Sequence, residues 1–321
     1  MTQQTFIRRP AAHPQDYPQI AALLSKVWPE PVTAAIMVEW MQRKPEGQIE
    51  EWQVAVTPEG ELVGYAEVIR QPWKPAGHLW LWVVVDPAWR HQGIGQMLYD
   101  HAVAAAQTLG ATTLLSNSYE AHPTGWRFAQ KQGFVIERRE FESSLDLASF
   151  DEQCFAGVID AVVATGIRFA ALAELGDTPE TRQKFYALNR ATTLDVPGSD
   201  GTFPSFEQSM HWHFNASWFL PEGLIFALDG ESFVGFCLVG YYAETKSMFN
   251  FMTGVDKAYR GRHLALALKL LTIQFAKAYG AAYIRTGNDS ENAPMLAINR
   301  KLGYQPLPGA YQLTKYLTAI T

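Results

Sequence analysis

The apolar positions of the first half of the chain follow two spacings, one typical of helices and one typical of strands. Ile20, Leu23 and Val27 recur on one face of a helix. Asp16 precedes that helix as a candidate N-cap. Along this half, the patterns predict a strand over 5–9, helices over 16–27 and 32–43, a hairpin of strands 52–57 and 62–70, a strand over 79–86, a helix over 94–109, a strand over 112–116, a helix over 124–132 and a last strand from Phe134.

The second half repeats this order of elements. Its patterns predict a strand over 167–173, helices over 179–193 and 206–214, a hairpin turning at 229–231, a strand over 248–255, a helix over 264–279, a strand over 282–286, a helix over 293–302 and strands from Tyr304. We therefore predict an α+β fold with one mixed sheet per half, flanked by helices. The last strand of each half is expected to complete the sheet of that half.

One passage of the chain occurs twice. Residues 85–95 read VDPAWRHQGIG and residues 255–265 read VDKAYRGRHLA, at an offset of 170 positions (260 − 90). The same offset aligns Gly110 with Gly280. This unit is far longer than a solenoid repeat of roughly 20 to 50 residues, so each copy is expected to have its own core. We predict two domains, 1–150 and 151–321, with 151–165 forming an apolar connecting helix.

The composition fits two ordinary globular domains. The chain has 321 residues, and a hydrophobic content of 48% is enough for two cores. A net charge of −6 gives no general attraction to nucleic acid or to an anionic membrane, so we expect neither as a partner. The N-terminus lacks an apolar signal core, and the longest apolar run, 79–85, is too short to span a bilayer. We expect a cytoplasmic protein.

The cysteines and histidines carry no metal or disulfide signal. Cys154 and Cys237 occur one per half without metal-ligand spacing, and we expect both to be small buried residues. Two cysteines so placed exclude a disulfide framework. His211 and His213 lie two positions apart on a predicted helix and face different directions. We therefore expect no metal site.

In both copies a hydrophobic strand ends at Asp86 or Asp256, turns through a short loop and enters a helix. Backbone N–H groups at a helix start are unsatisfied and carry partial positive charge, which suits a phosphate. Gly93 and Gly95 would let a pyrophosphate approach the backbone closely. For one loop alone, a tight turn that needs glycine is an equally good interpretation. Repetition with matched downstream spacing favours the phosphate site.

These loops resemble the signature of the GNAT family of acyl-CoA-dependent N-acyltransferases, which is Arg or Gln, two residues, Gly, one residue, then Gly or Ala. The first copy, Arg90-His91-Gln92-Gly93-Ile94-Gly95, matches fully. The second copy, Arg260-Gly261-Arg262-His263-Leu264-Ala265, departs at His263, where Gly is usual. A histidine adopts positive φ at a cost of about 1 kcal/mol, which weakens cofactor binding without excluding it. The resemblance covers nearly the whole chain as two tandem units.

The resemblance implies a sheet that splays open beside the strand ending at Val85 or Val255. The pantetheine of acetyl-CoA, the implied co-substrate, would lie there against strand backbone. We therefore expect Val83, Val85, Thr253 and Val255 at the cofactor. The fused pair could already supply the contact that single-domain relatives obtain by dimerising, so a monomer and a homodimer are both expected states.

A second family motif has an Asn eleven residues before a Gly-aromatic pair and a Tyr four residues before that Gly, which protonates the leaving thiolate. Asn292 lies eleven residues before Gly303-Tyr304 (303 − 292), but Asn299 fills the Tyr slot. The first copy has His122 and Ala129 there and keeps neither residue. Asn292 caps the following helix, contacts the cofactor, or does both. Asn299 is either a locally bonded side chain or a weak catalytic acid.

Acetylation of an amine needs a proton acceptor, because an amine with a pKa of about 10.4 is mostly cationic at pH 7. Glu67 shares one face of its predicted strand with Tyr65 and Ile69, and apolar surroundings raise the pKa of a carboxyl group. Its position matches the usual carboxylate base of the family. A solvated strand glutamate is the alternative. The second half has Leu238 at this position, which takes no proton.

We hypothesise a tandem acetyltransferase that moves an acetyl group from acetyl-CoA to a primary amine of a small molecule or peptide by direct attack. The residues leave open which half is catalytic. The alternative is that one or both halves bind CoA without catalysis, as a sensor or scaffold. A partly apolar acceptor is indicated by tryptophans in the regions that cover the acceptor in such folds, namely Trp28, Trp40, Trp73, Trp212 and Trp218.

Overall fold

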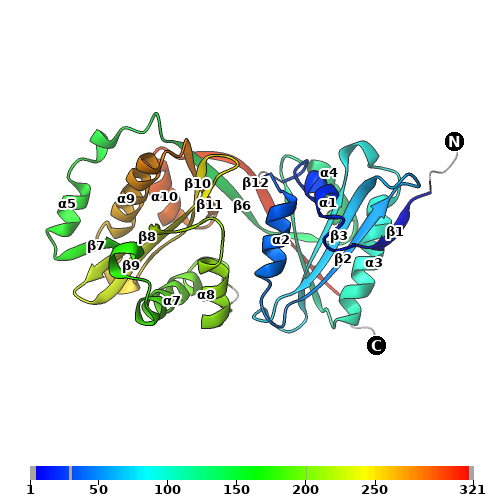
Figure 1. Ribbon diagram of the computed structural model, residues 1–321, viewed down its shortest axis with the longest axis horizontal. Coiled ribbons are helices and arrows are strands. Elements are labelled where there is room, and N and C mark those ends of the chain that lie inside the picture. The colour runs from blue at the N-terminus through cyan, green and yellow to red at the C-terminus, as the bar shows by residue number, and fades with distance from the viewer. Residues whose placement is uncertain (1–4, 29–30, 200, 318–321) are drawn as a thin grey trace. The chain divides into compact units, whose positions relative to one another are not determined.

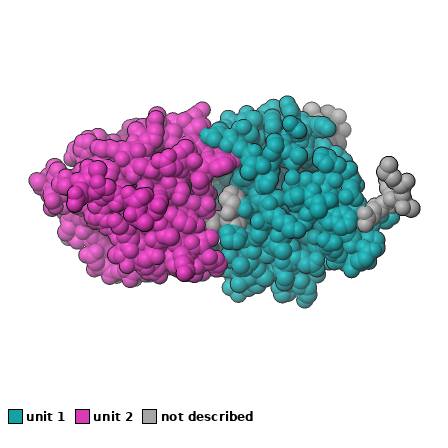
Figure 2. Space-filling model, turned by 90° about the horizontal axis from the view of Figure 1, so that it is seen from above, with its two compact units in different colours: residues 1–139, 310–321 teal, residues 140–309 magenta. Residues whose placement is uncertain are grey.

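The computed structural model describes residues 5–28, 31–199 and 201–317, which form two compact units. Unit 1 comprises residues 1–139 and 310–321, and unit 2 comprises residues 140–309 (Figure 2). The sequence predicts two domains, 1–150 and 151–321. In the structure, unit 2 begins at Glu140 instead. The C-terminal segment 310–321 belongs to unit 1.

The elements of the first copy follow the order predicted from apolar spacing (Figure 1). They are β1 (Ile7–Pro10), α1 (Tyr17–Leu24), α2 (Ala34–Gln42), β2 (Ile49–Val56), β3 (Leu62–Arg70), β4 (His78–Val85), α3 (Ile94–Thr108), β5 (Thr113–Tyr119), α4 (Pro123–Lys131) and β6 (Val135–Asp146).

The second copy repeats this order, as its sequence predicted. The predicted connecting helix is a 3-10 turn, Glu152–Phe155, followed by a short α5. The elements are α5 (Val158–Val163), β7 (Ile167–Ala171), α6 (Leu172–Leu175), α7 (Pro179–Leu194), α8 (Phe206–Phe214), β8 (Phe219–Asp229), β9 (Ser232–Tyr242), β10 (Ser247–Val255), α9 (Leu264–Tyr279), β11 (Tyr283–Asp289), α10 (Ala293–Lys301) and β12 (Gln305–Tyr316).

The two copies exchange their last strands. In unit 1 the strand order is β1-β2-β3-β4-β5-β12, and β12 pairs with β5 from Ala310↔Tyr119 to Tyr316↔Thr113. In unit 2 the order is β6-β11-β10-β9-β8-β7, and β6 pairs with β11 from Asp146↔Tyr283 to Glu140↔Asp289. The prediction that each last strand completes its own half was wrong, because strand periodicity identifies a buried face but not the pairing partner.

Helices cover both faces of the unit 1 sheet. On one face, α3 buries Leu98 and Ala102 against Leu81 of β4 and Leu114 of β5. On the other face, α1 and α2 pack over β2 and β3, with Ile20, Leu24, Met37, Val54 and Tyr65 among the buried residues. Each large side chain buried in this way contributes about 1.5–3 kcal/mol.

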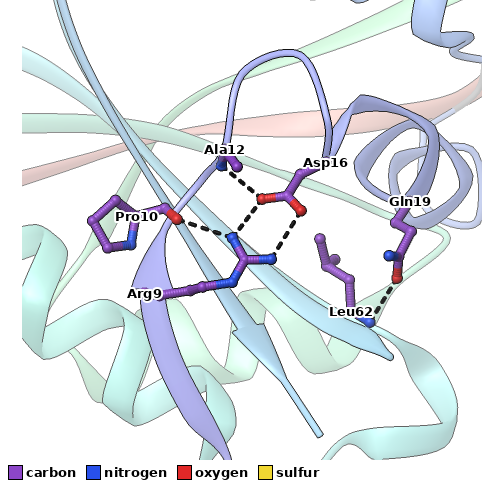
Figure 3. A network of polar contacts seen from close by, with 6 residues as sticks. All are labelled: Arg9, Pro10, Ala12, Asp16, Gln19 and Leu62. Atoms are coloured by element: carbon purple, nitrogen blue, oxygen red, sulfur yellow. Dashed lines mark hydrogen bonds and ion pairs between the residues drawn. The ribbon is translucent and has the colours of Figure 1, made fainter. Parts of the chain in front are cut away.

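A charged contact ties α1 to the edge of the sheet (Figure 3). Asp16 accepts hydrogen bonds from the Arg9 guanidinium at 2.6 and 2.9 Å and from the Ala12 amide at 2.7 Å. Arg9 thereby lowers the pKa of the Asp16 carboxyl group. Asp16 occupies the N-cap position of α1, but its side chain makes no capping hydrogen bond, contrary to the sequence-based interpretation. Gln19 of α1 accepts from the Leu62 amide at 2.9 Å and anchors the helix to β3.

The exchanged strand predicts which unit a core mutation loosens. Leu313 of β12 is buried in the unit 1 core, and Leu145 of β6 is buried in the unit 2 core. We expect Leu313→Ala to cost about 2–5 kcal/mol and to raise amide exchange in β5, measured by hydrogen–deuterium exchange. The matched variant Leu145→Ala should raise exchange in β11. Faster exchange in β11 after Leu313→Ala would contradict the observed pairing.

Candidate active site

Unit 1 has a wedge between two parallel strands. β4 and β5 pair only at His78↔Thr113, Leu79↔Leu114 and Trp80↔Leu115, although β4 continues to Val85 and β5 to Tyr119. A cavity of about 310 Å³ lies between the diverging strands and α4. Its lining includes Val83 and Val85 of β4, Asn117 of β5 and Phe128 of α4. The predicted splay is therefore present in unit 1.

Unit 2 repeats the wedge with a larger cavity. β10 and β11 pair from Ser247↔Tyr283 to Asn250↔Thr286, and β10 then continues to Val255 paired with β9 but no longer with β11. A cavity of about 560 Å³ is lined by the end of β10, including Thr253 and Val255, and by α10. Each unit thus presents unpaired strand edge beside an open space.

The loops that follow β4 and β10 share one backbone conformation. In unit 1, His91 has φ 63° and Gly93 has φ 85°. In unit 2, Gly261 has φ 78° and His263 has φ 62°. Both loops place two left-handed residues at the same positions, but glycine and histidine have exchanged places. His263 therefore adopts the positive φ that its position demands, and the departure from the signature leaves the shape of the loop intact.

The two loop arginines hold the turns in place, because each bonds the last carbonyl of its strand and a second side chain. Arg90 Nε donates to the Val85 carbonyl at 3.2 Å, and its Nη1 donates to Thr124 Oγ1 at 3.1 Å. Arg260 Nε donates to the Val255 carbonyl at 3.1 Å, and its Nη2 pairs with Asp195 at 2.7 Å. Asp195 also lines the unit 2 cavity. Arg260 is therefore paired with a carboxylate, whereas Arg90 in unit 1 bonds the Thr124 hydroxyl.

Most of the predicted loop residues reach the cavities. The unit 1 cavity is lined by Arg90, His91, Gly93 and Gly95, and the unit 2 cavity by Arg260, Gly261, His263, Leu264 and Ala265. Three predicted residues lie elsewhere. Ile94 is buried in the core, Gln92 is exposed, and Arg262 packs its guanidinium 4.8 Å from the Tyr259 ring centroid.

The loops have room for a phosphate. A Cβ built on Gly93 or on Gly261 would meet no atom within 4 Å, so the space above both loops is open. The first amides of α3 and α9 follow directly and carry the partial positive charge of a helix start. The residues present therefore fit the diphosphate of a CoA thioester.

Glu67 lies in a row of three side chains across unit 1. It pairs with Trp52 on β2 and with Trp82 on β4, and residues directly opposite in antiparallel strands share one face. Trp82 lines the cavity, whereas Glu67 itself is partly buried one strand away. Burial and the negative charge of Glu50 raise the pKa of Glu67 to about 8, although a hydrogen bond from Tyr65 acts in the opposite direction.

The corresponding row in unit 2 is apolar. Leu238 on β9 pairs with Leu224 on β8 and with Met252 on β10. Leu224 and Leu238 are both buried in the unit 2 core. The carboxylate and both tryptophans of unit 1 have therefore been replaced together.

Comparison with known proteins identifies the family. The family model described as the Acetyltransferase (GNAT) family matches residues 17–134 and again residues 188–304, which together make up more than half of the chain. The chain belongs to the GNAT family. It is an acyltransferase of the EC 2.3.1 type with two tandem GNAT domains. Acetyltransferases of the GNAT family use acetyl-CoA, and an amine acceptor is implied.

Curated relatives span most of the chain at low identity. A mycothiol acetyltransferase of Corynebacterium glutamicum is 24% identical over 255 residues, 78% of this chain and 77% of its own length. A mycothiol acetyltransferase of Amycolatopsis mediterranei is 22% identical over 253 residues, 77% of this chain and 78% of its own length. These likenesses support acetyl transfer in general.

Solved GNAT structures share the tandem fold. A tandem GNAT protein from the clavulanic acid biosynthesis pathway aligns with 97% of this chain and 98% of its own, with a TM-score of 0.75 and 19% identity. A GCN5-related N-acetyltransferase from Sphaerobacter thermophilus aligns with 97% of this chain and 95% of its own, with a TM-score of 0.71 and 19% identity. At this identity the likeness concerns the fold.

The second GNAT motif is split between cavity and core. Asn292 lines the unit 2 cavity and also caps α10 by accepting from the Met295 amide at 3.4 Å, so both predicted roles are compatible with its position. Asn299 is 2% exposed and donates to Asn288 Oδ1 at 2.7 Å. Asn299 is absent from the cavity lining, and its local bond matches the non-catalytic interpretation.

Several site residues escaped the sequence analysis of this GNAT chain. Trp82 Nε1 donates to Asn117 Oδ1 at 2.7 Å and so bridges β4 and β5 across the wedge. Alternation along β4 would have placed Trp82 on the face of Glu67. Among the predicted tryptophans, Trp28 lines the unit 1 cavity beside Trp40, whereas Trp218 stacks on Phe251 in unit 2.

Other sequence expectations have mixed outcomes. Cys237 is buried as expected, but Cys154 is exposed, because it lies in the 3-10 turn before α5 rather than in an apolar helix face. Across the described residues, no three His, Cys, Asp or Glu side chains converge as metal ligands would. In the same residues, no helix combines the length and apolar character that crossing a membrane requires.

The matching loops predict two acetyl-CoA sites. Calorimetric titration of the full chain with acetyl-CoA should give two sites, because both loops have the same backbone shape. Gly95→Glu should remove one site and Ala265→Glu the other, since each places a carboxylate where we expect the phosphate to bind. The fold should accept Gly95→Glu, because a Cβ there lies at an ordinary 3.6 Å from Val85. Unchanged stoichiometry in both variants would contradict the loop assignment.

Proposed function

We propose that unit 1 transfers the acetyl group of acetyl-CoA to a primary amine of a small molecule or peptide. Glu67 is the general base, and the loop from Arg90 to Gly95 binds the diphosphate. Unit 2 binds a CoA compound without transferring its acyl group to an amine. The observation that carries this proposal is the row Trp52–Glu67–Trp82 in unit 1 and its replacement by Leu224–Leu238–Met252 in unit 2.

The chemistry requires the amine to lose a proton. An amine with a pKa of about 10.4 is far from a carboxylate with an ordinary pKa of about 4.3, so an unperturbed glutamate is a poor acceptor. A Glu67 pKa of about 8 narrows that gap and still leaves a useful carboxylate fraction near neutral pH. Glu67 takes the proton at its carboxylate oxygen, directly or through one water. The amine nitrogen bonds to the acetyl carbon, the carbon–sulfur bond breaks, and CoA leaves as a thiolate that takes a proton from solvent.

Neighbouring residues support this role. When bound, acetyl-CoA supplies an activated thioester. The hydrogen bond from Trp82 to Asn117 connects β4 and β5 where the two strands have separated. Trp28 adds an apolar surface to the cavity lining. The aromatic walls limit water around the reacting carbonyl and suit an acceptor with an apolar part. Because the curated relatives are named mycothiol acetyltransferases, we include mycothiol-related amines in the panel of acceptors to be tested.

A second candidate function concerns the whole chain. Both units would bind CoA compounds without turnover and act as a sensor or scaffold. The motivating observation is that neither copy keeps the motif Tyr, since Ala129 and the buried Asn299 fill its slots. Absence of turnover with every amine in a broad panel, together with two-site CoA binding, would favour this function over the first.

The pH profile tests the base. We expect kcat/KM for amine acetylation to rise with pH and level off above about 8, as the Glu67 carboxyl group loses its proton. Glu67→Gln should lower kcat by about 10²–10⁴-fold and remove this inflection. Glu59→Gln, in the exposed hairpin turn, is the matched control and should leave both unchanged. Wild-type turnover and the same inflection in Glu67→Gln would refute the assignment.

Stability provides an independent readout of the same group. Because the folded-state pKa of Glu67 is raised to about 8, the native protein keeps a proton that the unfolded chain loses above an ordinary glutamate pKa. The free energy of unfolding should therefore fall as pH rises between about 4.5 and 8. Glu67→Gln removes this loss, so urea denaturation of unit 1 at about pH 9 should show a more stable variant. Equal stabilities across this range would contradict the raised pKa.

A further inference from the structure

Unit 2 contains a cluster of five polar side chains, of which four are buried and Thr253 is partly buried. By strand register and by the offset of 170, its positions correspond to apolar or aromatic positions in unit 1. The cluster consists of Cys237, Asn250, Thr253, Lys269 and Thr272, which replace Ala66, Leu81, Val83, Tyr99 and Ala102. Because five neighbouring positions are polar in unit 2 and apolar or aromatic in unit 1, we expect the closed end of the unit 2 wedge to contact a different chemical group.

Lys269 is the centre of this cluster. It lies on α9 and is 1% exposed. Its Nζ donates to Asn250 Oδ1 at 2.8 Å and lies 5.0 Å from the Tyr304 ring centroid. Asn250 is held in turn, because its Nδ2 donates to the Leu238 and Met252 carbonyls at 3.1 and 3.2 Å. The ammonium group is therefore fixed in place by a rigid amide.

The charge of Lys269 has no described counterion. Among the residues that the structure describes, no carboxylate pairs with its Nζ, and the one charge that raises its pKa is that of Cys237. Burial lowers the pKa of Lys269 to about 8, so the side chain is still mainly cationic at neutral pH. A buried cation without an anion is energetically costly, and an anionic ligand nearby would remove much of that cost.

The cluster adjoins the unit 2 cavity through Thr253. Thr253 lines the cavity, and its Oγ1 donates to Asn250 Oδ1 at 3.1 Å, the same oxygen that accepts from Lys269. Asn250 and Thr286 form the last pair before β10 and β11 separate, so the cluster lies at the closed end of the wedge. From there, Gly254 and Val255 lead along the cavity wall to the phosphate loop.

We propose that the unit 2 cavity binds a CoA thioester whose acyl group ends in a carboxylate. The phosphate loop holds the diphosphate. The Thr253 hydroxyl turns its hydrogen from Asn250 Oδ1 to the ligand carboxylate, and Lys269, which stays bonded to Asn250 Oδ1, balances the negative charge. The cavity of about 560 Å³, compared with about 310 Å³ in unit 1, has room for an acyl group longer than acetyl. This inference rests on the proposed function in one respect, namely that unit 2 binds CoA compounds.

Two stable CoA thioethers test the inference. The full chain carrying Gly95→Glu, which blocks the unit 1 loop, is titrated calorimetrically with S-(2-carboxyethyl)-CoA and with S-propyl-CoA, whose S-substituent is uncharged. The carboxylate compound should bind at least about tenfold more tightly, as expected for a charge-assisted contact in a buried site. The chain carrying Ala265→Glu, with only unit 1 open, should show no such preference, because Val83 and Leu81 replace Thr253 and Asn250.

Two further substitutions assign the preference to the cluster. Lys269→Met and Thr253→Val, each made in the Gly95→Glu chain, should reduce the preference to less than about threefold by weakening the carboxylate compound. Thr253→Val is nearly isosteric, so it preserves the test if Lys269→Met fails to fold. Equal binding of both thioethers by the Gly95→Glu chain would overturn this inference alone. Failure of every CoA compound to bind that chain would overturn CoA binding by unit 2 as well.

Discussion

Beyond Trp80, β4 and β5 stop pairing, and the backbone N–H and C=O groups that this separation leaves must find other partners. The wedge stays open because each of the two strands is paired along its other edge with a further strand. β3 pairs with β4 up to Val85, and the exchanged β12 pairs with β5 along its full length. Trp82 and Asn117 join across the opening. The open edge of β4 and the cavity beside it depend on this separation.

Duplication kept the scaffold and changed the chemistry placed on it. Both units retain the wedge, the two left-handed loop residues and the arginine that bonds the last strand carbonyl. The differences concentrate on two surfaces of the wedge. Unit 1 has a carboxylate between two tryptophans on neighbouring strands, whereas unit 2 has leucines and methionine there. Unit 2 in turn has buried Lys269 where unit 1 has Tyr99. We interpret this pattern as a division of tasks within the GNAT pair.

Apolar spacing was enough to predict the order of the elements, and the resemblance of the repeated loop to the GNAT signature was enough to predict the wedge. The exchange of β6 and β12 was beyond reach, because alternation along 305–316 is satisfied equally by pairing with either unit. Asn299 and Lys269 show a second limit. Both are polar residues on amphipathic helices, and only the three-dimensional contacts reveal that each is buried and bonded to an asparagine. Glu67 was predictable because strand period places it on a face with Tyr65.

The central claim is that acetyl transfer takes place in unit 1. The most direct test is the steady-state rate of amine acetylation by the two loop-blocked chains, with acetyl-CoA as donor and the same amine panel for both. The account predicts that Ala265→Glu keeps turnover near the wild-type rate, while Gly95→Glu loses it. Turnover that survives Gly95→Glu and disappears with Ala265→Glu would place the reaction in unit 2 and contradict the role of Glu67.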